Sequence, residues 1–249
     1  MNFLAIIPAR FQSTRFPGKP LEKLAGKYII QHVYEKASEN FQHVWVATDD
    51  DRIAKAVQDF GGKVVMTDAN HPSGTDRVAE AARKLKSEID FDVVVNIQGD
   101  EPFVCAEQLD AIKQCFKDDA TQIATLVKRV EDAETLFNPN RPKVVFSSRN
   151  FALLFSRSTI PYVRGVEREQ WLSKQSFFYH LGMYAYRAEV LQTLTKLKPS
   201  NLELAESLEQ LRWLEAGYKI KIAETAHESI GIDTPEDLQK AQEFWNVTH

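Results

Sequence analysis

The first apolar run of the chain, Phe-Leu-Ala-Ile-Ile at residues 3–7, leads into Pro8-Ala9-Arg10 and a polar loop that ends at Lys19-Pro20. A short apolar run bounded by a turn signal is typical of a buried strand. Similar runs at 43–47, 63–66 and 93–97 alternate with helical spacing at 28–38, 52–60, 76–86 and 107–116. This alternation predicts an α/β fold with a mainly parallel sheet and helices on both faces.

The second half of the chain has a less regular pattern. We expect strands at 123–128, 143–146, 152–155, 179–186 and 219–223, and one amphipathic helix over 202–216. Pro235 predicts the start of a last helix, with Asp233 or Thr234 as its cap. The stretch 163–176 is polar and irregular. We interpret residues 1–249 as a single domain with an irregular excursion at about 130–190.

The overall composition excludes several classes of protein. The chain has 249 residues, 43% of them hydrophobic, which is enough to bury a substantial core. Its net charge of −4 argues against general binding to nucleic acid or acidic membranes, because both usually need a basic face. Apolar runs fall short of the roughly 20 residues of a membrane span, and the start lacks a basic leader. We therefore expect a cytoplasmic protein without membrane insertion.

The two cysteines, Cys105 and Cys115, lie in one predicted helix. Ten residues of helix span roughly 15 Å. A disulfide tolerates a Cα separation of only about 7 Å, so both cysteines are expected to be free thiols. The sequence around them lacks the cluster of Cys and His that a zinc site would need, so we do not expect them to bind metal.

The loop after the first strand carries three cations: Arg10, Arg15 and Lys19. Ligands of open α/β sheets bind beyond the carboxyl ends of the strands, so these cations fall where a nucleotide would lie. One guanidinium group can bind two phosphate oxygens at once, and an ammonium adds a compact positive charge. Gly18 allows close backbone approach, and the Ser13 and Thr14 hydroxyls can donate hydrogen bonds. The alternative is a solvated surface loop, and the absence of Walker A and Gly-x-Gly-x-x-Gly patterns disfavours an NTPase or a dehydrogenase.

Two aspartates are candidate metal ligands. Asp100 follows the buried run 93–97, and Asp233 precedes the last helix. Mg²⁺ prefers oxygen ligands and usually takes one or two protein carboxylates together with substrate phosphates. The alternatives are that Asp100 is a turn residue and that Asp233 only caps the helix.

The stretch Ser73-Gly74-Thr75-Asp76-Arg77 opens a predicted helix. Its amides and hydroxyls can hydrogen-bond a base or a phosphate at the helix N-terminus, although a plain cap is the competing interpretation. Asp49, after the second strand, is close enough in topology to contribute.

The segment from Ile7 to Leu21, Ile-Pro-Ala-Arg-x-x-Ser-Thr-Arg-x-Pro-Gly-Lys-Pro-Leu, resembles the signature of the CMP-Kdo synthetase (3-deoxy-manno-octulosonate cytidylyltransferase) family. The resemblance continues in the same order over nearly the whole chain. Its further motifs are Ala-Thr-Asp at 47–49, His-Pro-Ser-Gly-Thr-Asp-Arg at 71–77, Asn-Ile-Gln-Gly-Asp-Glu-Pro at 96–102, Phe-Ser-Arg-Ser-Thr-Ile-Pro at 155–161, His-Leu-Gly at 180–182, Leu-Glu-Gln-Leu-Arg at 208–212 and Gly-Ile-Asp-Thr-Pro-Glu-Asp-Leu at 231–238.

The resemblance implies a Rossmann-like nucleotide-diphospho-sugar transferase fold with an inserted dimerisation subregion. It implies that CTP and Kdo (3-deoxy-D-manno-octulosonate) give CMP-Kdo and pyrophosphate, for lipopolysaccharide biosynthesis, in a cytoplasmic homodimer. It assigns Mg²⁺ to Asp100 and Asp233, and catalysis to these two residues with Arg10, Arg15 and Lys19. The residues that it implies for CTP are Arg10, Ser13, Arg15, Lys19, Asp49, Ser73, Gly74, Thr75 and Arg77.

Kdo carries a carboxylate and many hydroxyls, so its site needs a cation and several neutral donors and acceptors. The matching motifs supply Gln98, Arg157, His180, Glu209 and Gln210. Arg157 is the expected partner of the sugar carboxylate. The competing interpretations are that Glu209 and Gln210 form the solvated face of a helix and that His180 is a structural histidine.

Three other functions compete with this interpretation. A CMP-sialate synthetase would share the Pro-Ala-Arg start, but not the Ser-Thr-Arg-x-Pro-Gly-Lys arrangement. A nucleotide-sugar sensor without catalysis would not need two metal-binding aspartates. A scaffold protein would leave the loop cations unexplained.

Overall fold

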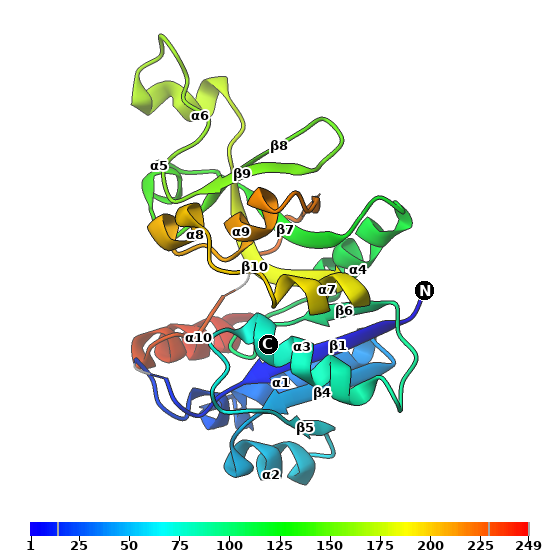
Figure 1. The fold of residues 1–249 in the computed structure, drawn as a ribbon. Helices are drawn as coiled ribbons and strands as arrows, with labels where there is room; N and C mark the ends of the chain where they lie inside the picture. The colour runs from blue at the N-terminus through cyan, green and yellow to red at the C-terminus, as the bar shows by residue number, and fades with distance from the viewer. Residues whose placement is uncertain (14, 229, 249) are drawn as a thin grey trace. The chain divides into compact units, whose positions relative to one another are not determined.

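The computed structural model describes residues 1–13, 15–228 and 230–248. The chain forms two compact units, shown in Figure 1. Unit 1 comprises Met1–Leu109 and the C-terminal segment after Glu228, and unit 2 comprises Asp110–Glu228. Within the described residues, no helix has the length and apolar character needed to cross a membrane. The single domain with an excursion at about 130–190 stays a prediction.

The sheet of unit 1 is entirely parallel, in the order β6–β1–β4–β5. Its strands are β1 (Phe3–Ala9), β4 (His43–Thr48), β5 (Val64–Met66) and β6 (Val93–Asn96). Residues Leu4 to Ile7 of β1 are all fully buried. Because successive side chains of a strand point to opposite faces, both faces of β1 are covered, as in other parallel sheets. The predicted α/β class is confirmed.

The helices of unit 1 begin and end within a few residues of the predicted ranges. They are α1 (Ile29–Asn40), α2 (Asp51–Asp59), α3 (Gly74–Leu85), α10 (Pro235–Thr248) and the first part of α4 (Ala106–Gln114), which continues into unit 2 from Asp110. Two short elements have no predicted counterpart: the 3₁₀ turn η1 (Lys19–Leu21) and the hairpin of β2 (Lys23–Leu24) and β3 (Lys27–Tyr28). Helix α10 is fixed by an apolar cluster in which Ala241 packs with Leu24, Ile29 and Ile232.

The sheet of unit 2 is mixed, in the order β11–β7–β10–β8–β9. Its strands are β7 (Ile123–Arg129), β8 (Lys143–Phe146), β9 (Ala152–Ser156), β10 (Phe178–Arg187) and β11 (Ile220–Glu224). Only β11 runs parallel to its neighbour, β7. The helical elements are η2 (Cys115–Lys117), α5 (Ala133–Phe137), η3 (Arg168–Gln170), α6 (Trp171–Lys174), α7 (Ala188–Leu194), α8 (Asn201–Glu206) and α9 (Gln210–Glu215).

The single helix predicted over 202–216 is wrong, because the structure has two helices there. Helix α8 ends at Glu206, because the next residue, Ser207, has a left-handed φ of 51° that interrupts the helical hydrogen bonds, and α9 begins at Gln210. The apolar spacing continues through the break, which is why the pattern did not reveal it. The irregular stretch 163–176 contains η3 and α6, and the buried Trp171 donates from Nε1 to the Val166 carbonyl at 2.9 Å.

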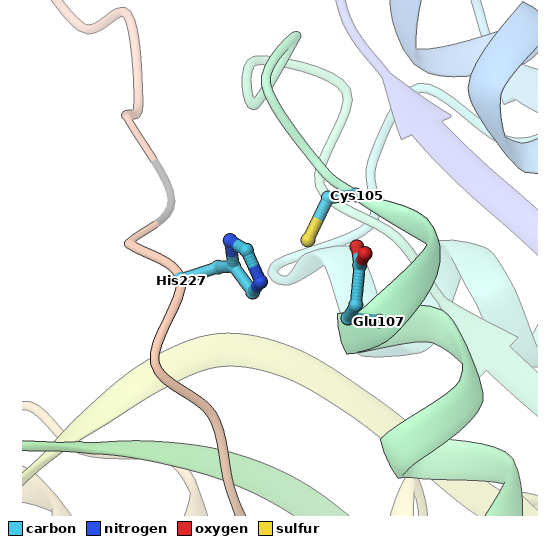
Figure 2. A group of neighbouring side chains, drawn as sticks. All are labelled: Cys105, Glu107 and His227. Carbon is cyan, nitrogen blue, oxygen red and sulfur yellow. The ribbon is translucent and has the colours of Figure 1, made fainter.

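The predicted free thiols are confirmed, since Cys105 and Cys115 are unpaired. Cys105 directly precedes α4, with Glu107 in the first turn (Figure 2), and Cys115 lies in η2 after the helix. Burial raises the pKa of Cys115 to about 11. That thiol therefore stays protonated and unreactive near neutral pH.

Candidate active site

A crevice of about 830 Å³ opens in unit 1 where β1, β4 and β6 end. Most of the predicted CTP and metal residues line it, and so does Gln98. The predicted residues in its lining are Arg10, Ser13, Arg15, Lys19, Asp49, Ser73, Gly74, Arg77, Gln98, Asp100 and Asp233. Thr75 is buried and is not among the lining residues, and Thr14 lies outside the described residues.

The loop after β1 folds back on itself at Gly18. The Gly18 N–H donates to the Phe11 carbonyl at 2.9 Å, and its φ of 75° is the left-handed conformation that glycine adopts without strain. Arg52 stacks on the other side of this turn, with its guanidinium carbon 3.3 Å from the centre of the Phe11 ring. The turn ends in η1, which places Lys19 in the crevice with only 12% of its side chain exposed.

The structure brings the positive loop and the two predicted metal ligands together. Lys19 Nζ lies 2.6 Å from Asp100 Oδ2 and 3.1 Å from Asp233 Oδ1. Arg15 Nη2 lies 3.0 Å from the other oxygen of Asp233. Within the described part of the chain, Arg10 has no ion-pair partner. The loop after β1 therefore contributes three cations to the crevice, and two of them, Arg15 and Lys19, pair with the predicted metal ligands.

A close approach of backbone segments holds Asp100 at the end of β6. A Cβ atom at Gly99 would lie 2.8 Å from the Pro8 carbonyl oxygen and 3.2 Å from Ile30 Cδ1. Only glycine fits this contact between the ends of β1 and β6 without a shift. The carboxylate that follows it is therefore fixed relative to the loop after β1.

Asp233 does not cap α10, because Thr234 does. Thr234 Oγ1 accepts from the Asp237 N–H at 3.2 Å, and Asp237 Oδ2 accepts from the N–H groups of Thr234 at 3.0 Å and Asp233 at 3.1 Å. The Ile232 N–H donates to the Asp100 carbonyl at 2.9 Å. These bonds leave the Asp233 carboxylate pointing into the crevice, and Asp237 is a positioning residue that the sequence analysis missed.

Asp237→Ala is expected to weaken the binding of divalent cations by about tenfold and to lower stability by about 1 kcal/mol, the usual cost of losing such a bond at a helix start. The physical reason is that the Asp233 N–H loses the carboxylate oxygen that accepts its hydrogen bond. Titration with Mn²⁺ in the presence of CTP, followed by electron paramagnetic resonance, measures the affinity. The matched control is Asp132→Ala, which removes the cap of α5 at Thr135 in unit 2. An equal loss of Mn²⁺ affinity in both variants would contradict the positioning role.

The segment predicted to recognise the base is already hydrogen-bonded within itself. Ser73 caps α3, because its Oγ accepts from the Asp76 N–H at 3.2 Å and donates to Asp76 Oδ2 at 2.6 Å. Arg77 is buried, with Nη1 2.9 Å from Asp49 Oδ1, and it donates to Thr67 Oγ1 at 2.6 Å. In this structure the Ser73 hydroxyl therefore caps the helix. Ser73, Asp49 and Arg77 nevertheless all line the crevice.

His71 in the crevice wall has a carboxylate partner that the sequence analysis did not single out. Its Nε2 makes a short contact with Glu80 Oε2, which also accepts from the Asp68 N–H at 2.9 Å, while Lys84 lies 2.7 Å from Oε1. Burial alone would raise the pKa of Glu80. The hydrogen bonds from Lys84, Asp68 and His71 outweigh it and lower the pKa to about 2 from an ordinary value of 4.5.

This lowered pKa gives a pH-dependent stability. The folded pKa of Glu80 lies below its unfolded value, so its contribution is complete above about pH 4.5 and is lost as the pH falls towards 2. Urea unfolding of the wild type and Glu80→Gln at several pH values checks this. The difference in unfolding free energy is expected to be largest at neutral pH and to shrink below pH 4.5. A difference that stays constant over this range would refute the assignment.

Four of the predicted Kdo residues belong to unit 2, whereas Gln98 belongs to unit 1. His180 on β10 is partly buried, and the burial of its ring lowers its pKa to about 3, so the ring is neutral near pH 7. Its Nε2 lies 3.0 Å from Thr125 Oγ1, and that hydroxyl donates to the Met183 carbonyl at 2.7 Å. Because the Thr125 hydroxyl donates its proton to the carbonyl, its oxygen accepts a hydrogen bond from the imidazole. We therefore assign the ring proton of neutral His180 to Nε2.

Gln210 and Glu209 lie at the start of α9 and differ in burial. Gln210 is 4% exposed, so the interpretation as a solvated helix face is wrong for this residue. Glu209 is partly exposed and makes a short contact with Arg212, whose Nε lies 3.6 Å from Glu203.

Arg157 uses its guanidinium to bind backbone carbonyls within unit 2. It donates to the carbonyls of Glu206 at 2.6 Å, Pro139 at 2.9 Å and Ser207 at 3.3 Å. Its role as the partner of a sugar carboxylate stays a prediction.

The fully buried Lys143 donates to the Asn138 carbonyl at 2.7 Å, and burial together with the charge of Arg157 lowers the pKa of this lysine. No pattern in the sequence distinguishes this buried lysine, because it lies in an ordinary predicted strand.

A parallel sheet whose strands end at a crevice lined with cations and carboxylates is typical of nucleotide-binding α/β proteins. The family model described as cytidylyltransferase matches residues 4–222. The chain belongs to the cytidylyltransferase family, and within it to the 3-deoxy-manno-octulosonate cytidylyltransferases.

Relatives of that name cover nearly the whole chain. The 3-deoxy-manno-octulosonate cytidylyltransferase of Parabacteroides distasonis is 58% identical over 248 residues, 98% of each sequence. That of Bacteroides thetaiotaomicron is 58% identical over 247 residues, again 98% of each. A solved structure of CMP:2-keto-3-deoxy-manno-octonic acid synthetase in complex with CTP superposes with a TM-score of 0.92 at 42% identity, covering 100% of both chains.

Proposed function

We propose that this chain transfers CMP from CTP to Kdo and releases pyrophosphate. The observation that carries the proposal is the convergence of Lys19 and Arg15 on Asp100 and Asp233 in the crevice of a cytidylyltransferase chain. Nucleotidyl transfer needs both kinds of group, because cations bind the triphosphate and carboxylates hold its metal ion. The names of relatives at 58% identity over 98% of the chain support Kdo as the acceptor.

The two carboxylates suit a magnesium ion. Their oxygens converge on one positive centre, Lys19 Nζ, at 2.6 and 3.1 Å, so the same oxygens can be directed at one cation. Carboxylate oxygen is the ligand type that Mg²⁺ prefers. We therefore propose Asp100 and Asp233 as its protein ligands. A bound magnesium ion would supply charge screening of the triphosphate and stabilise charge that develops on its oxygens.

The residues of the crevice perform the remaining tasks. Arg10, Arg15 and Lys19 bind phosphate oxygens and hold the triphosphate in line with the acceptor. The 2-hydroxyl of Kdo attacks the α-phosphorus and loses its proton, a new O–P bond forms, and the bond to the β-phosphate oxygen breaks. The leaving group is pyrophosphate, and no covalent bond to the protein forms. Most of the rate acceleration comes from positioning and electrostatics.

A pyrophosphate-release assay tests this function. The wild-type protein is incubated with Mg²⁺ and each of CTP, UTP, ATP and GTP, with either Kdo or N-acetylneuraminate as acceptor. Pyrophosphate is expected with CTP and Kdo, and omission of the metal is expected to abolish it. Faster release with N-acetylneuraminate would favour the CMP-sialate synthetase alternative, and no release with any pair would overturn the proposal.

We also propose that the protein works as a cytoplasmic homodimer in lipopolysaccharide biosynthesis. Several large apolar side chains between residues 130 and 190 are exposed in unit 2, among them Leu153 at 63% and Tyr162 at 72%. An exposed apolar group of this kind is common where subunits associate. Light scattering after size-exclusion chromatography should give twice the mass of the 28.4 kDa chain. A mass of one chain at micromolar concentration would refute the dimer.

A further inference from the structure

Lys19 contacts one oxygen of each of the two carboxylates proposed as metal ligands. Its ammonium contacts Asp100 Oδ2 at 2.6 Å and Asp233 Oδ1 at 3.1 Å, and Arg15 contacts the second oxygen of Asp233 at 3.0 Å. Lys19 is 12% exposed, whereas Arg15 is 65% exposed, so the lysine is held in the crevice and the arginine lies at its surface. Both carboxylates are therefore neutralised by the protein's own cations.

An ammonium and a divalent cation cannot share these oxygens. Mg²⁺ binds carboxylate oxygen at about 2.0–2.1 Å. A cation at that distance from Asp100 Oδ2 would stand within a few ångströms of Lys19 Nζ, where like charges repel strongly in a partly desolvated site. Metal binding therefore requires Lys19 to leave.

We propose that Lys19 keeps the carboxylate pair closed to divalent cations until the triphosphate of the nucleotide draws its ammonium away. This inference rests on the proposed function, because it takes Asp100 and Asp233 as the metal ligands. It adds that nucleotide and metal binding are coupled through the exchange of partners by one side chain.

The charges around the crevice favour such an exchange. Phosphate oxygens are strong partners for ammonium and guanidinium groups. Arg10, which has no ion-pair partner among the described residues, is available for the first contact with the triphosphate. When Lys19 and Arg15 then pair with phosphates, Asp100 and Asp233 lose their counter-charges and become ligands. By linkage, the nucleotide strengthens metal binding by the same factor as the metal strengthens nucleotide binding.

The test is the binding of Mn²⁺ to the protein without nucleotide or sugar, followed by the electron paramagnetic resonance signal of free Mn²⁺. Lys19→Met removes the ammonium and keeps an apolar stem of similar length. It is expected to bind Mn²⁺ at least about tenfold more tightly than the wild type. Lys19→Gln is a second variant with the same expected gain, and circular dichroism verifies that each variant is folded.

Two matched variants separate this effect from a general change in charge. Arg10→Met removes one positive charge from the same loop but leaves both carboxylates paired, so it is expected to change Mn²⁺ affinity less than about threefold. The double variant Lys19→Met with Asp100→Asn is expected to lose the gained affinity, which assigns the ion to this pair of carboxylates.

The outcomes separate this inference from the proposed function. Equal Mn²⁺ affinity in the wild type and both Lys19 variants would overturn the inference, and so would an equal gain in Arg10→Met. Neither result would affect the proposed function, which depends on pyrophosphate release by the wild type with CTP and Kdo. Tight Mn²⁺ binding by the Lys19 variants alone would support the inference.

Discussion

Asp100→Asn is expected to lower the rate of pyrophosphate release about a thousandfold while the fold stays intact. The amide keeps the shape of the side chain but loses the charge that faces Lys19 Nζ at 2.6 Å, and with it one of the two carboxylates that we propose as ligands of the divalent cation. Loss of one electrostatic contact to developing charge costs about 10²–10³ in turnover, and the loss of a metal ligand adds to this. The Asp100 carbonyl still accepts from the Ile232 N–H, so the local backbone is preserved.

A matched control for this variant lies on α4. Asp110 contacts Lys113 Nζ at 2.6 Å on the surface, far more exposed than Asp100, with 58% of its side chain accessible. Asp110→Asn removes the same charge from the same kind of ion pair and is expected to keep turnover within about twofold, because exposed ion pairs contribute little. Steady-state kinetics and circular dichroism on both variants provide the measurement. Wild-type turnover in Asp100→Asn would remove this residue from the active site.

Arg157→Ala is expected to destabilise the protein by about 2–3 kcal/mol. The guanidinium donates to three backbone carbonyls, those of Glu206, Pro139 and Ser207, and alanine has no donor to take its place. Hydrogen bonds from a charged donor contribute about 1.5–3 kcal/mol each when buried, and two of these three are exposed, so their sum is smaller than three full bonds. Urea unfolding at pH 7 measures the loss.

The same variant also tests the predicted contact with the sugar. If Arg157 binds the Kdo carboxylate, the KM for Kdo rises far more than the KM for CTP in Arg157→Ala. Arg157→Lys is the comparison, because it keeps the positive charge but lacks the planar fork of guanidinium donors that reaches the three carbonyls. Full stability in Arg157→Ala would contradict the structural role, and equal changes in both KM values would contradict the contact with the sugar.

The sequence predicted unit 1 well because its signals are local and repeated. Each parallel strand is a short apolar run followed by a turn. Pro235 begins α10, because the fixed φ of proline suits the first position of a helix. Unit 2 was harder to predict. The break at Ser207 depends on a left-handed serine, a conformation that few side chains signal, and the spacing of apolar residues runs through it.

The candidate site shows the same division. Sequence motifs identified Lys19, Asp100 and Asp233 separately, but they gave no means of seeing that the cation would be paired with both carboxylates, since those contacts join residues 81 and 214 positions apart. Asp237 was missed because its importance lies in which backbone N–H groups it accepts from. Arg157 was assigned by its charge, whereas its three carbonyl contacts depend on the turn that follows α8.

The hydrogen bond from Ile232 to Asp100 has a consequence for a nascent chain. Ribosomes deliver the strands of unit 1 long before residue 233 is translated, so the sheet can assemble while one acidic ligand has not yet been made. A polypeptide halted before its last helix would present Arg10, Arg15 and Lys19 with only one of the two aspartates. The Asp233 carboxylate therefore joins the crevice only after the segment that follows unit 2 has been synthesised.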